Sequence, residues 1–177
     1  MKNRRTFVTA ASALAVSLSA GCLTHSIRSI APDQAFDPQA AQALLAPGNA
    51  NVSGEAFLRQ AGGAIVTCAG GDVALIPATP YFSALLDNAF EGADFYEVYS
   101  SASPLPPIAL ADHPEAQRHA TCDSQGRFQF RGLAGGDYYL VTKIVWCCGP
   151  YTSAQGGWLR KRITVGPAET AHVIVTL

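Results

Sequence analysis

Apolar and polar side chains alternate along the last third of the chain. Phe128 and Phe130 are separated by Gln129 and flanked by Arg127 and Arg131. A period of two is typical of a strand that buries one face, so the two Phe rings are predicted to point inward. The same reading predicts strands at 52–59, 72–78, 117–122, 127–131, 138–146, 158–165 and 171–177, with a few extended residues at 64–68. Short strands separated by frequent Gly- and Pro-containing turns predict an all-β protein, a β-sandwich of about seven strands.

Residues 138–146 form the longest of these predicted strands. One side of it carries an almost wholly apolar set, which we predict to face inward: Tyr138, Leu140, Thr142, Ile144 and Trp146.

One segment has a helical period instead. Apolar residues recur at spacings of three and four at Phe82, Leu85, Leu86, Ala89 and Phe90. This spacing predicts a short amphipathic helix over 81–91, ending at Gly92. A long connection rich in Pro and Ala follows to residue 116, so we expect an insertion at 81–116 within one domain spanning 51–177.

The N-terminus reads as a bacterial export signal. Lys2, Arg4 and Arg5 precede an apolar stretch, 7–18, that is too short to span a membrane, and small residues lead to Cys22. We expect residues 1–21 to be a signal peptide of the lipoprotein type and Cys22 to carry lipid. The paired Arg also fit a twin-arginine signal, so the export route can be either the Sec or the twin-arginine pathway.

This leader predicts where in the cell the mature protein is located. Leu23 follows Cys22 with no Asp beside it, which by known sorting rules favours the outer membrane, facing the periplasm or the surface. The expected partner is therefore the membrane, through the N-terminal lipid. Residues 22–50 are expected to be a lipidated tether, with a short helix at 39–45 capped by Asp37 before Pro38.

Charge excludes one class of partner. Without the three basic residues of the leader, the chain has nine basic and thirteen acidic residues. A mildly acidic exported domain lacks the basic face that nucleic acid requires, so we expect no nucleic-acid partner. An envelope protein or a glycan is the expected class of further partner.

Four cysteines remain besides Cys22, namely Cys68, Cys122, Cys147 and Cys148. Disulfides are expected in an oxidising compartment, and four cysteines allow three pairings. A bond between the adjacent Cys147 and Cys148 is sterically awkward, so we favour one of them pairing with Cys68 or Cys122. A metal site is the alternative, but the paired spacing typical of zinc ligands is absent.

The clearest candidate for ligand recognition lies near the C-terminus. Trp158, Arg160 and Arg162 alternate along one predicted strand, and Tyr151 lies in the loop before it. An exposed ridge of aromatic and guanidinium groups could stack on a sugar ring or contact a peptide. An ordinary polar strand face has the same pattern, so both interpretations stay open.

Residues for an active site are sparse. His113 and His119 flank Glu115 in the predicted connection, whereas His25 lies in the tether and His172 on a predicted solvent face. No nucleophile elbow accompanies the Ser residues. We expect no catalytic residues, no metal and no cofactor. An enzyme with a site in the 81–119 region remains the alternative.

The segment Asp123-Ser124-Gln125-Gly126-Arg127-Phe128-Gln129-Phe130-Arg131-Gly132-Leu133, followed by Gly136-Asp137-Tyr138, carries a family pattern. An Asp-x-x-Gly turn, a Phe-x-Phe strand, Gly-Leu and Gly-x-Tyr resemble the carboxypeptidase regulatory-like domain. The segments 52–54, 73–75 and 173–175 are similar to the opening and last strands of that family. The resemblance implies a transthyretin-like (prealbumin-like) Greek-key sandwich over 51–177. Its motifs serve packing and turns, so it implies a fold and no chemistry.

Together these observations predict a lipid-anchored structural or binding module of the cell envelope without catalytic activity. A carbohydrate- or peptide-binding domain that uses the ridge is the first alternative, and the enzyme is the second.

Overall fold

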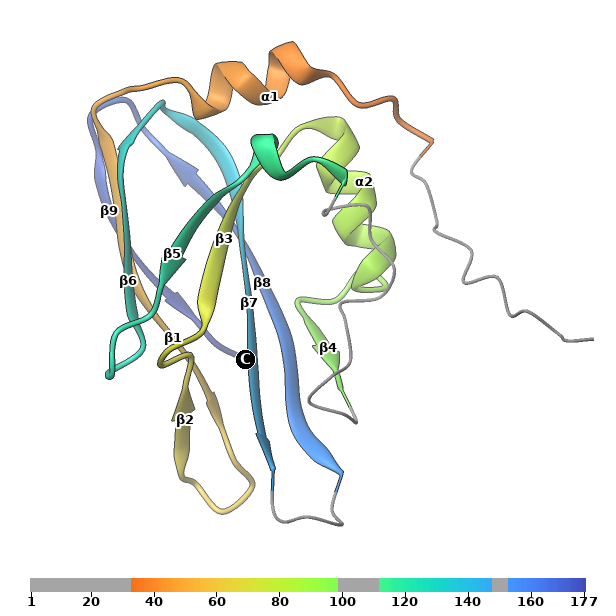
Figure 1. Cartoon of the computed structure of the whole chain (residues 1–177), viewed down its shortest axis with the longest axis vertical. Helices are drawn as coiled ribbons and strands as arrows, with labels where there is room; N and C mark the ends of the chain where they lie inside the picture. Colours follow the sequence, from red (N-terminus) through yellow and green to blue (C-terminus); the bar gives the residue numbers. More distant parts are fainter. Residues whose placement is uncertain (1–32, 99–111, 148–152) are drawn as a thin grey trace, which may run out of the picture.

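The computed structural model describes residues 33–98, 112–147 and 153–177. Two β-sheets and two α-helices make up this part of the chain (Figure 1). The protein is an all-β sandwich, as the sequence predicted. Cys22, Tyr151, Cys148, the signal peptide and most of the connection before Pro114 lie outside the described residues.

The first sheet is built around β1 (Ala50–Arg59). It pairs with β6 (Arg127–Leu133) and β2 (Ile65–Thr67) in antiparallel fashion and with β9 (Thr170–Val175) in parallel. The parallel pair joins strands from opposite ends of the domain, so the first and last strands lie side by side.

The second sheet has the order β4–β8–β7–β3–β5, and every neighbouring pair is antiparallel. Its strands are β3 (Asp72–Pro77), β4 (Phe95–Glu97), β5 (Arg118–Thr121), β7 (Gly136–Cys147) and β8 (Ala154–Val165). The described residues thus hold nine strands, more than the seven or so that the sequence predicted. β4 lies within the predicted insertion, where three residues are too few to show a period.

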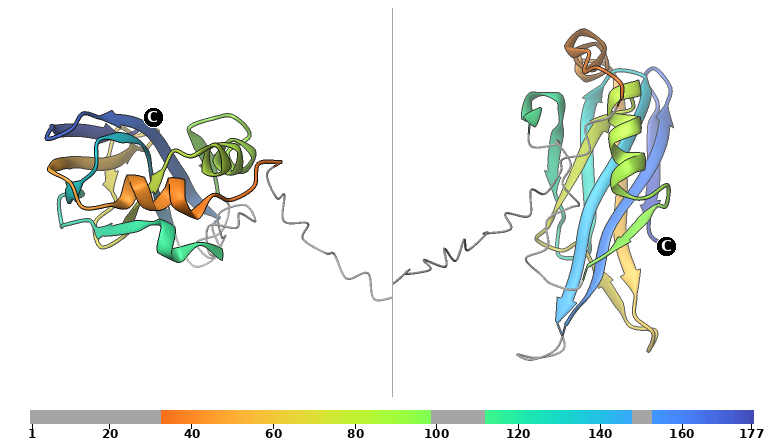
Figure 2. Two further views of the ribbon diagram at one scale, coloured as in Figure 1. Left: turned by 90° about the horizontal axis from the view of Figure 1, so that it is seen from above. Right: turned by 90° about the vertical axis from the view of Figure 1, so that its right-hand side faces the viewer.

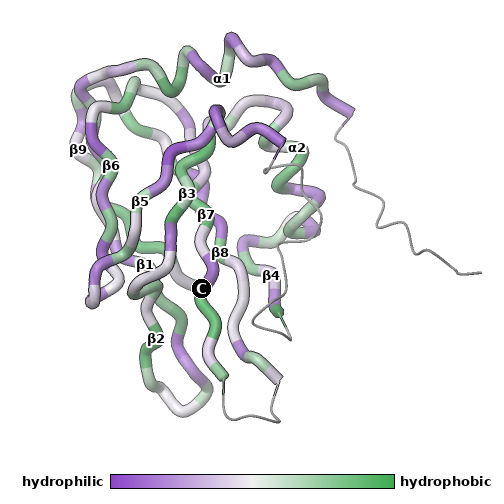
Figure 3. The backbone as a smooth tube through the Cα atoms, in the orientation of Figure 1, coloured by the Kyte–Doolittle hydropathy of each residue, from purple (hydrophilic) through white to green (hydrophobic). Residues whose placement is uncertain are grey.

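The main core lies between the two sheets. Phe128 and Phe130 of β6 are buried there together with Tyr138, Leu140 and Ile144 of β7, as the alternation predicted. Trp146 only packs against the margin of this core. Figure 3 shows hydrophobic and hydrophilic stretches alternating along the strands of both sheets.

A second core covers the other face of the β4–β8–β7–β3–β5 sheet. There α2 (Pro80–Ala89) packs on Ile76, Tyr139 and Val141, so β7 is buried on both faces (Figure 2). The helix begins where Thr79 Oγ1 accepts a hydrogen bond from the Phe82 backbone N–H, and Pro80 occupies its first turn. The predicted helix is confirmed, and it buries four residues of the helical period, Phe82, Leu85, Leu86 and Ala89, together with Tyr81.

The segment before β1 packs onto the sandwich. Helix α1 (Pro38–Leu45) lies across one end of the domain (Figure 1) and buries Ala41. The Tyr138 hydroxyl donates to the Leu44 carbonyl over 2.6 Å. The described part of the predicted tether is therefore a docked element of the domain, because its apolar residues find partners on the sandwich. None of the helices in the described ranges has the length and hydropathy needed to cross a bilayer.

Candidate functional site

The predicted ridge of Trp158, Arg160 and Arg162 lies on the face of β8 that meets α2. Arg160 is only 7% exposed. Its Nη1 lies 2.7 Å from Asp87 Oδ1 of α2, and its Nε lies 3.4 Å from Asp94 Oδ1. Its guanidinium also stacks over the Phe90 ring at 5.3 Å. The prediction that Arg160 is exposed is wrong, because the insertion folds over this part of the strand.

The two outer members of the ridge differ in exposure. Trp158 is half-buried, with the Lys143 ammonium 5.4 Å from its ring centroid. Its indole N–H is shielded from solvent and has no hydrogen-bond partner. Arg162 is exposed and lies 5.9 Å from the centroid of the Tyr139 ring. The three side chains therefore share a face without forming one exposed surface.

Asp137 holds Arg162 in place. Thr164 Oγ1 donates to Asp137 Oδ1 over 2.6 Å, and Arg162 Nη2 donates to Oδ2 over 2.9 Å. These two hydrogen bonds, that of Thr164 first, lower the pKa of Asp137. The carboxylate stays charged at neutral pH and compensates the Arg162 guanidinium.

The histidines of the predicted enzyme site have different surroundings. His113 stacks on Phe36 with ring centroids 3.7 Å apart and contacts the edges of Tyr81 and Phe82. His119 is an exposed residue of β5. No group of three or more potential metal-ligating side chains occurs among residues 33–98, 112–147 and 153–177. The described start of the insertion is an apolar helix rather than a cleft lined by carboxylates.

The disulfide joins Cys68 to Cys122. The pairing that we favoured, Cys147 or Cys148 with one of these two, is therefore wrong. Cys68 and Cys122 follow β2 and β5, and backbone hydrogen bonds from Gly70 to Cys122 and from Cys122 to Gly71 bring them together. Cys147 is exposed and unbonded. The disulfide also removes Cys68 and Cys122 from the thiolate metal site considered as the alternative.

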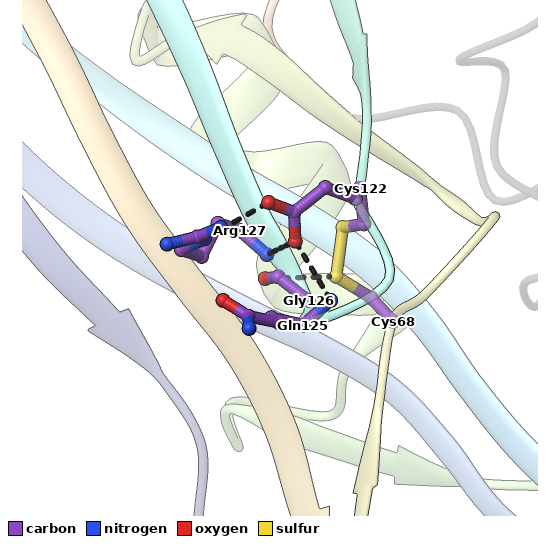
Figure 4. A network of polar contacts seen from close by, with 6 residues as sticks. Cys68, Cys122, Gln125, Gly126 and Arg127 are labelled. Atoms are coloured by element: carbon purple, nitrogen blue, oxygen red, sulfur yellow. Dashed lines mark hydrogen bonds and ion pairs between the residues drawn. A yellow bond between two sulfur atoms is a disulfide. The ribbon is translucent and has the colours of Figure 1, made fainter.

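The turn from Asp123 to Arg127 lies next to this disulfide (Figure 4). Asp123 Oδ1 accepts hydrogen bonds from the backbone N–H groups of Gln125 and Arg127, at 2.8 and 2.9 Å. Gly126 has φ +79°, which favours glycine. The backbone hydrogen bond from Arg127 and then its side-chain bond to Oδ2 lower the pKa of Asp123. The turn thus fixes an ionised carboxylate and a guanidinium side by side.

A shallow groove of about 700 Å³ lies beside this turn. Register places Gln129 of β6 and His172 of β9 on either side of Ser53 of β1. The Ser53 hydroxyl lies 3.4 Å from His172 Nδ1, so the three strands present a continuous row of polar groups. His119 and Thr121 of β5 and the Asp123–Arg127 pair extend the lining. The groove offers both donors and acceptors to a ligand.

Sequence reasoning did not find this groove. Its residues come from four strands, and only the pairing of β1 with both β6 and β9 makes Gln129, Ser53 and His172 neighbours. The sequence did indicate that Arg127 and Gln129 point outward and that His172 lies on a solvent face. The sequence therefore indicated that these residues are exposed, but not that they are neighbours.

Comparison with known proteins supports the fold. A crystal structure described as "a putative carbohydrate binding protein" from Pseudomonas aeruginosa superimposes with a TM-score of 0.65 and 26% sequence identity, covering 81% of this chain and 99% of that one. A minor pilin of Streptococcus agalactiae gives a TM-score of 0.35 at 16% identity, covering 75% of this chain and 44% of that one, which supports no conclusion. No protein-family model matches the chain. No curated protein matches it in sequence.

Proposed function

We propose that this protein is an exported, lipid-anchored carbohydrate-binding module of the cell envelope without catalytic activity, and that the groove beside Ser53 receives the glycan. The observation that carries the proposal is the similarity to the Pseudomonas protein, which extends over 99% of that chain. The transthyretin-like variety of sandwich is part of the same proposal. The inward Phe128 and Phe130 and the Asp123–Gly126 turn, which carry the resemblance, support it.

The chemistry of the groove suits a polyhydroxylated ligand. A sugar ring presents closely spaced hydroxyls, each both a donor and an acceptor. Gln129 and Ser53 match them with neutral polar groups, whereas Asp123 and Arg127 add a charged acceptor and donor. Glycan recognition here would rest mainly on hydrogen bonds, because Phe128, the one Phe, Tyr or Trp among the described lining residues, is buried.

The glycan proposal is tested with the soluble domain on a glycan array, followed by calorimetric titration of any glycan that binds. Gln129→Ala should weaken binding by roughly tenfold, the cost of one or two lost hydrogen bonds. The matched control is Gln60→Ala, an amide outside the groove near the end of β1.

The ridge is the competing location, and the same titration separates the two. Arg162→Ala should leave the affinity unchanged if the groove binds the glycan. An equal loss for Gln129→Ala and Gln60→Ala, or a loss confined to Arg162→Ala, would place the ligand elsewhere. Absence of binding to any glycan would leave a structural module as the function.

The lipid anchor on Cys22 belongs to the proposal as well. A disulfide between Cys68 and Cys122 is typical of exported proteins, which supports passage out of the cytoplasm. Radiolabelled palmitate should enter the wild-type protein in growing cells and fail to enter Cys22→Ser. Labelling that persists in Cys22→Ser would contradict attachment at this residue.

A further inference from the structure

The free edges of the two sheets are protected to different degrees. β2 and β4 have three residues each, and β5 has four, including Arg118. The Arg118 guanidinium donates to the carbonyls of Arg131 and Gly132, so it covers the neighbouring edge of β6. Short strands and charged side chains are the usual means of preventing strands of other chains from pairing.

β9 lacks these protections. It is six residues long, contains neither Pro nor Lys, Arg, Asp or Glu, and pairs only with β1 among the described strands. Ile174 is 44% exposed on it, and Leu177, 71% exposed, follows it. With Ile65, these are the large hydrophobic residues that the described part of the chain exposes. A groove lined by Ile163, Ala171 and Val173 runs along the same edge.

The backbone groups on this edge follow from the pairing with β1. The Asn51 N–H donates to the Glu169 carbonyl over 2.7 Å. In a parallel ladder that starts there, Ala171, Val173 and Val175 direct their N–H and C=O groups to β1. Thr170, His172 and Ile174 therefore direct theirs away from the sheet, which leaves a row of donors and acceptors at the edge.

We infer that β9 pairs in antiparallel fashion with β9 of a second copy of this chain, so that the protein is a two-fold symmetric dimer with a continuous sheet across the two β9 strands. A strand pairs with its own copy only if no like charges face each other, and this strand has no carboxylate or basic side chain apart from His172. A twofold axis at Val173 sets His172 opposite Ile174 of the second copy. The outward N–H and C=O groups of both residues then form hydrogen bonds between the two copies, and Val173 faces Val173 of the second copy.

Lys161 lines the groove beside this edge, Glu55 of β1 is the cross-strand partner of Ile174, and Glu169 directly precedes β9. Lys161 is exposed, and its long stem allows the ammonium to stay in water while a second strand is added. His172 belongs to both surfaces, because its side chain lines the carbohydrate groove and its backbone groups lie on the dimer edge. The dimer inference rests on the edge of β9 and does not require that a glycan binds in the groove.

The test measures mass by sedimentation equilibrium on the full chain, with Cys22, Cys147 and Cys148 replaced by Ser in every sample to exclude lipid and unintended disulfides. The parent should sediment as a dimer, and Ile174→Lys should raise the dissociation constant at least roughly tenfold. The matched control is Ile65→Lys, which places the same charge on another exposed Ile (54%, against 44% for Ile174) at a different edge and should leave the dimer intact.

A second measurement checks the register. Under oxidation Val173→Cys should form a disulfide between two copies, because Val173 faces itself across the axis, whereas Ala171→Cys should not. A monomeric parent at all concentrations would overturn the inference. Equal effects of the two Lys variants, or equal cross-linking of the two Cys variants, would do the same.

Discussion

Arg160 and Arg162 show how much the surroundings of one residue type can differ along a single strand. They lie two positions apart on β8 and face the same side of the sheet. Arg160 is enclosed by Asp87, Asp94 and Phe90 of the insertion, whereas Arg162 shares an exposed ion pair with Asp137. The first arginine fastens α2 to the sheet, and the second is available to solvent.

Arg160→Ala should therefore destabilise the protein by about 2–4 kcal/mol, because it removes buried packing as well as two ion pairs. Arg162→Ala should cost at most about 1 kcal/mol, as expected for an exposed pair. Urea unfolding followed by tryptophan fluorescence measures both. Equal costs would show that Asp87 and Asp94 contribute no more than a surface ion pair does.

At the scale of elements, β1 is the strand that organises the first sheet. It has β6 and β9 on its two sides, and Gly54 is paired with Phe128 of β6 and with Val173 of β9. A Cβ added to Gly54 would come within 2.8 Å of the Phe128 ring and closer still to the Val173 carbonyl. The close packing of β6 and β9 against β1 thus depends on the absence of a side chain at this residue.

Gly54→Ala should cost at least about 2 kcal/mol, because backbone cannot move away from the added methyl without disturbing β9. Gly62→Ala is the matched control, since a Cβ there meets no atom within 4 Å, and it should change stability by no more than about 0.5 kcal/mol. Thermal unfolding monitored by circular dichroism compares them. A cost for Gly54→Ala no greater than that of the control would refute the close approach.

The pattern of side chains located most of these elements, and it located them best where one face alone is buried. From Arg127 to Arg131, β6 has exposed and buried residues in strict alternation, and the sequence predicted both sides of it. β7 also buries Tyr139 and Val141, on the face predicted to be outward, because α2 covers that face. No local pattern shows that a helix will pack against a strand more than forty residues away.

At the scale of the whole molecule, the Cys68–Cys122 disulfide connects the two sheets. Cys68 directly follows β2 of the first sheet and Cys122 follows β5 of the second, 54 residues apart. A bond that closes so long a loop restricts the unfolded chain strongly. The sandwich layers are therefore joined covalently as well as by their shared core.

Replacing Cys68 and Cys122 together by Ala should lower the free energy of unfolding by about 4 kcal/mol, the value expected from the entropy of a loop of this length. Cys147→Ala should have little effect, because Cys147 is exposed and unbonded. Urea unfolding under oxidising conditions gives both values. A loss below about 1 kcal/mol for the double variant would show that the disulfide contributes little to stability.

The all-β class, the helix of the insertion and the inward Phe residues follow from the amino-acid pattern, because the period of neighbouring side chains specifies them. The disulfide partner of Cys68, the burial of Arg160 and the assembly of the groove from four strands arise only in the folded protein. Each of these depends on which distant strands become neighbours. The packing of whole sheets and helices decides which strands become neighbours, and the spacing of residues along one strand carries no information about that packing.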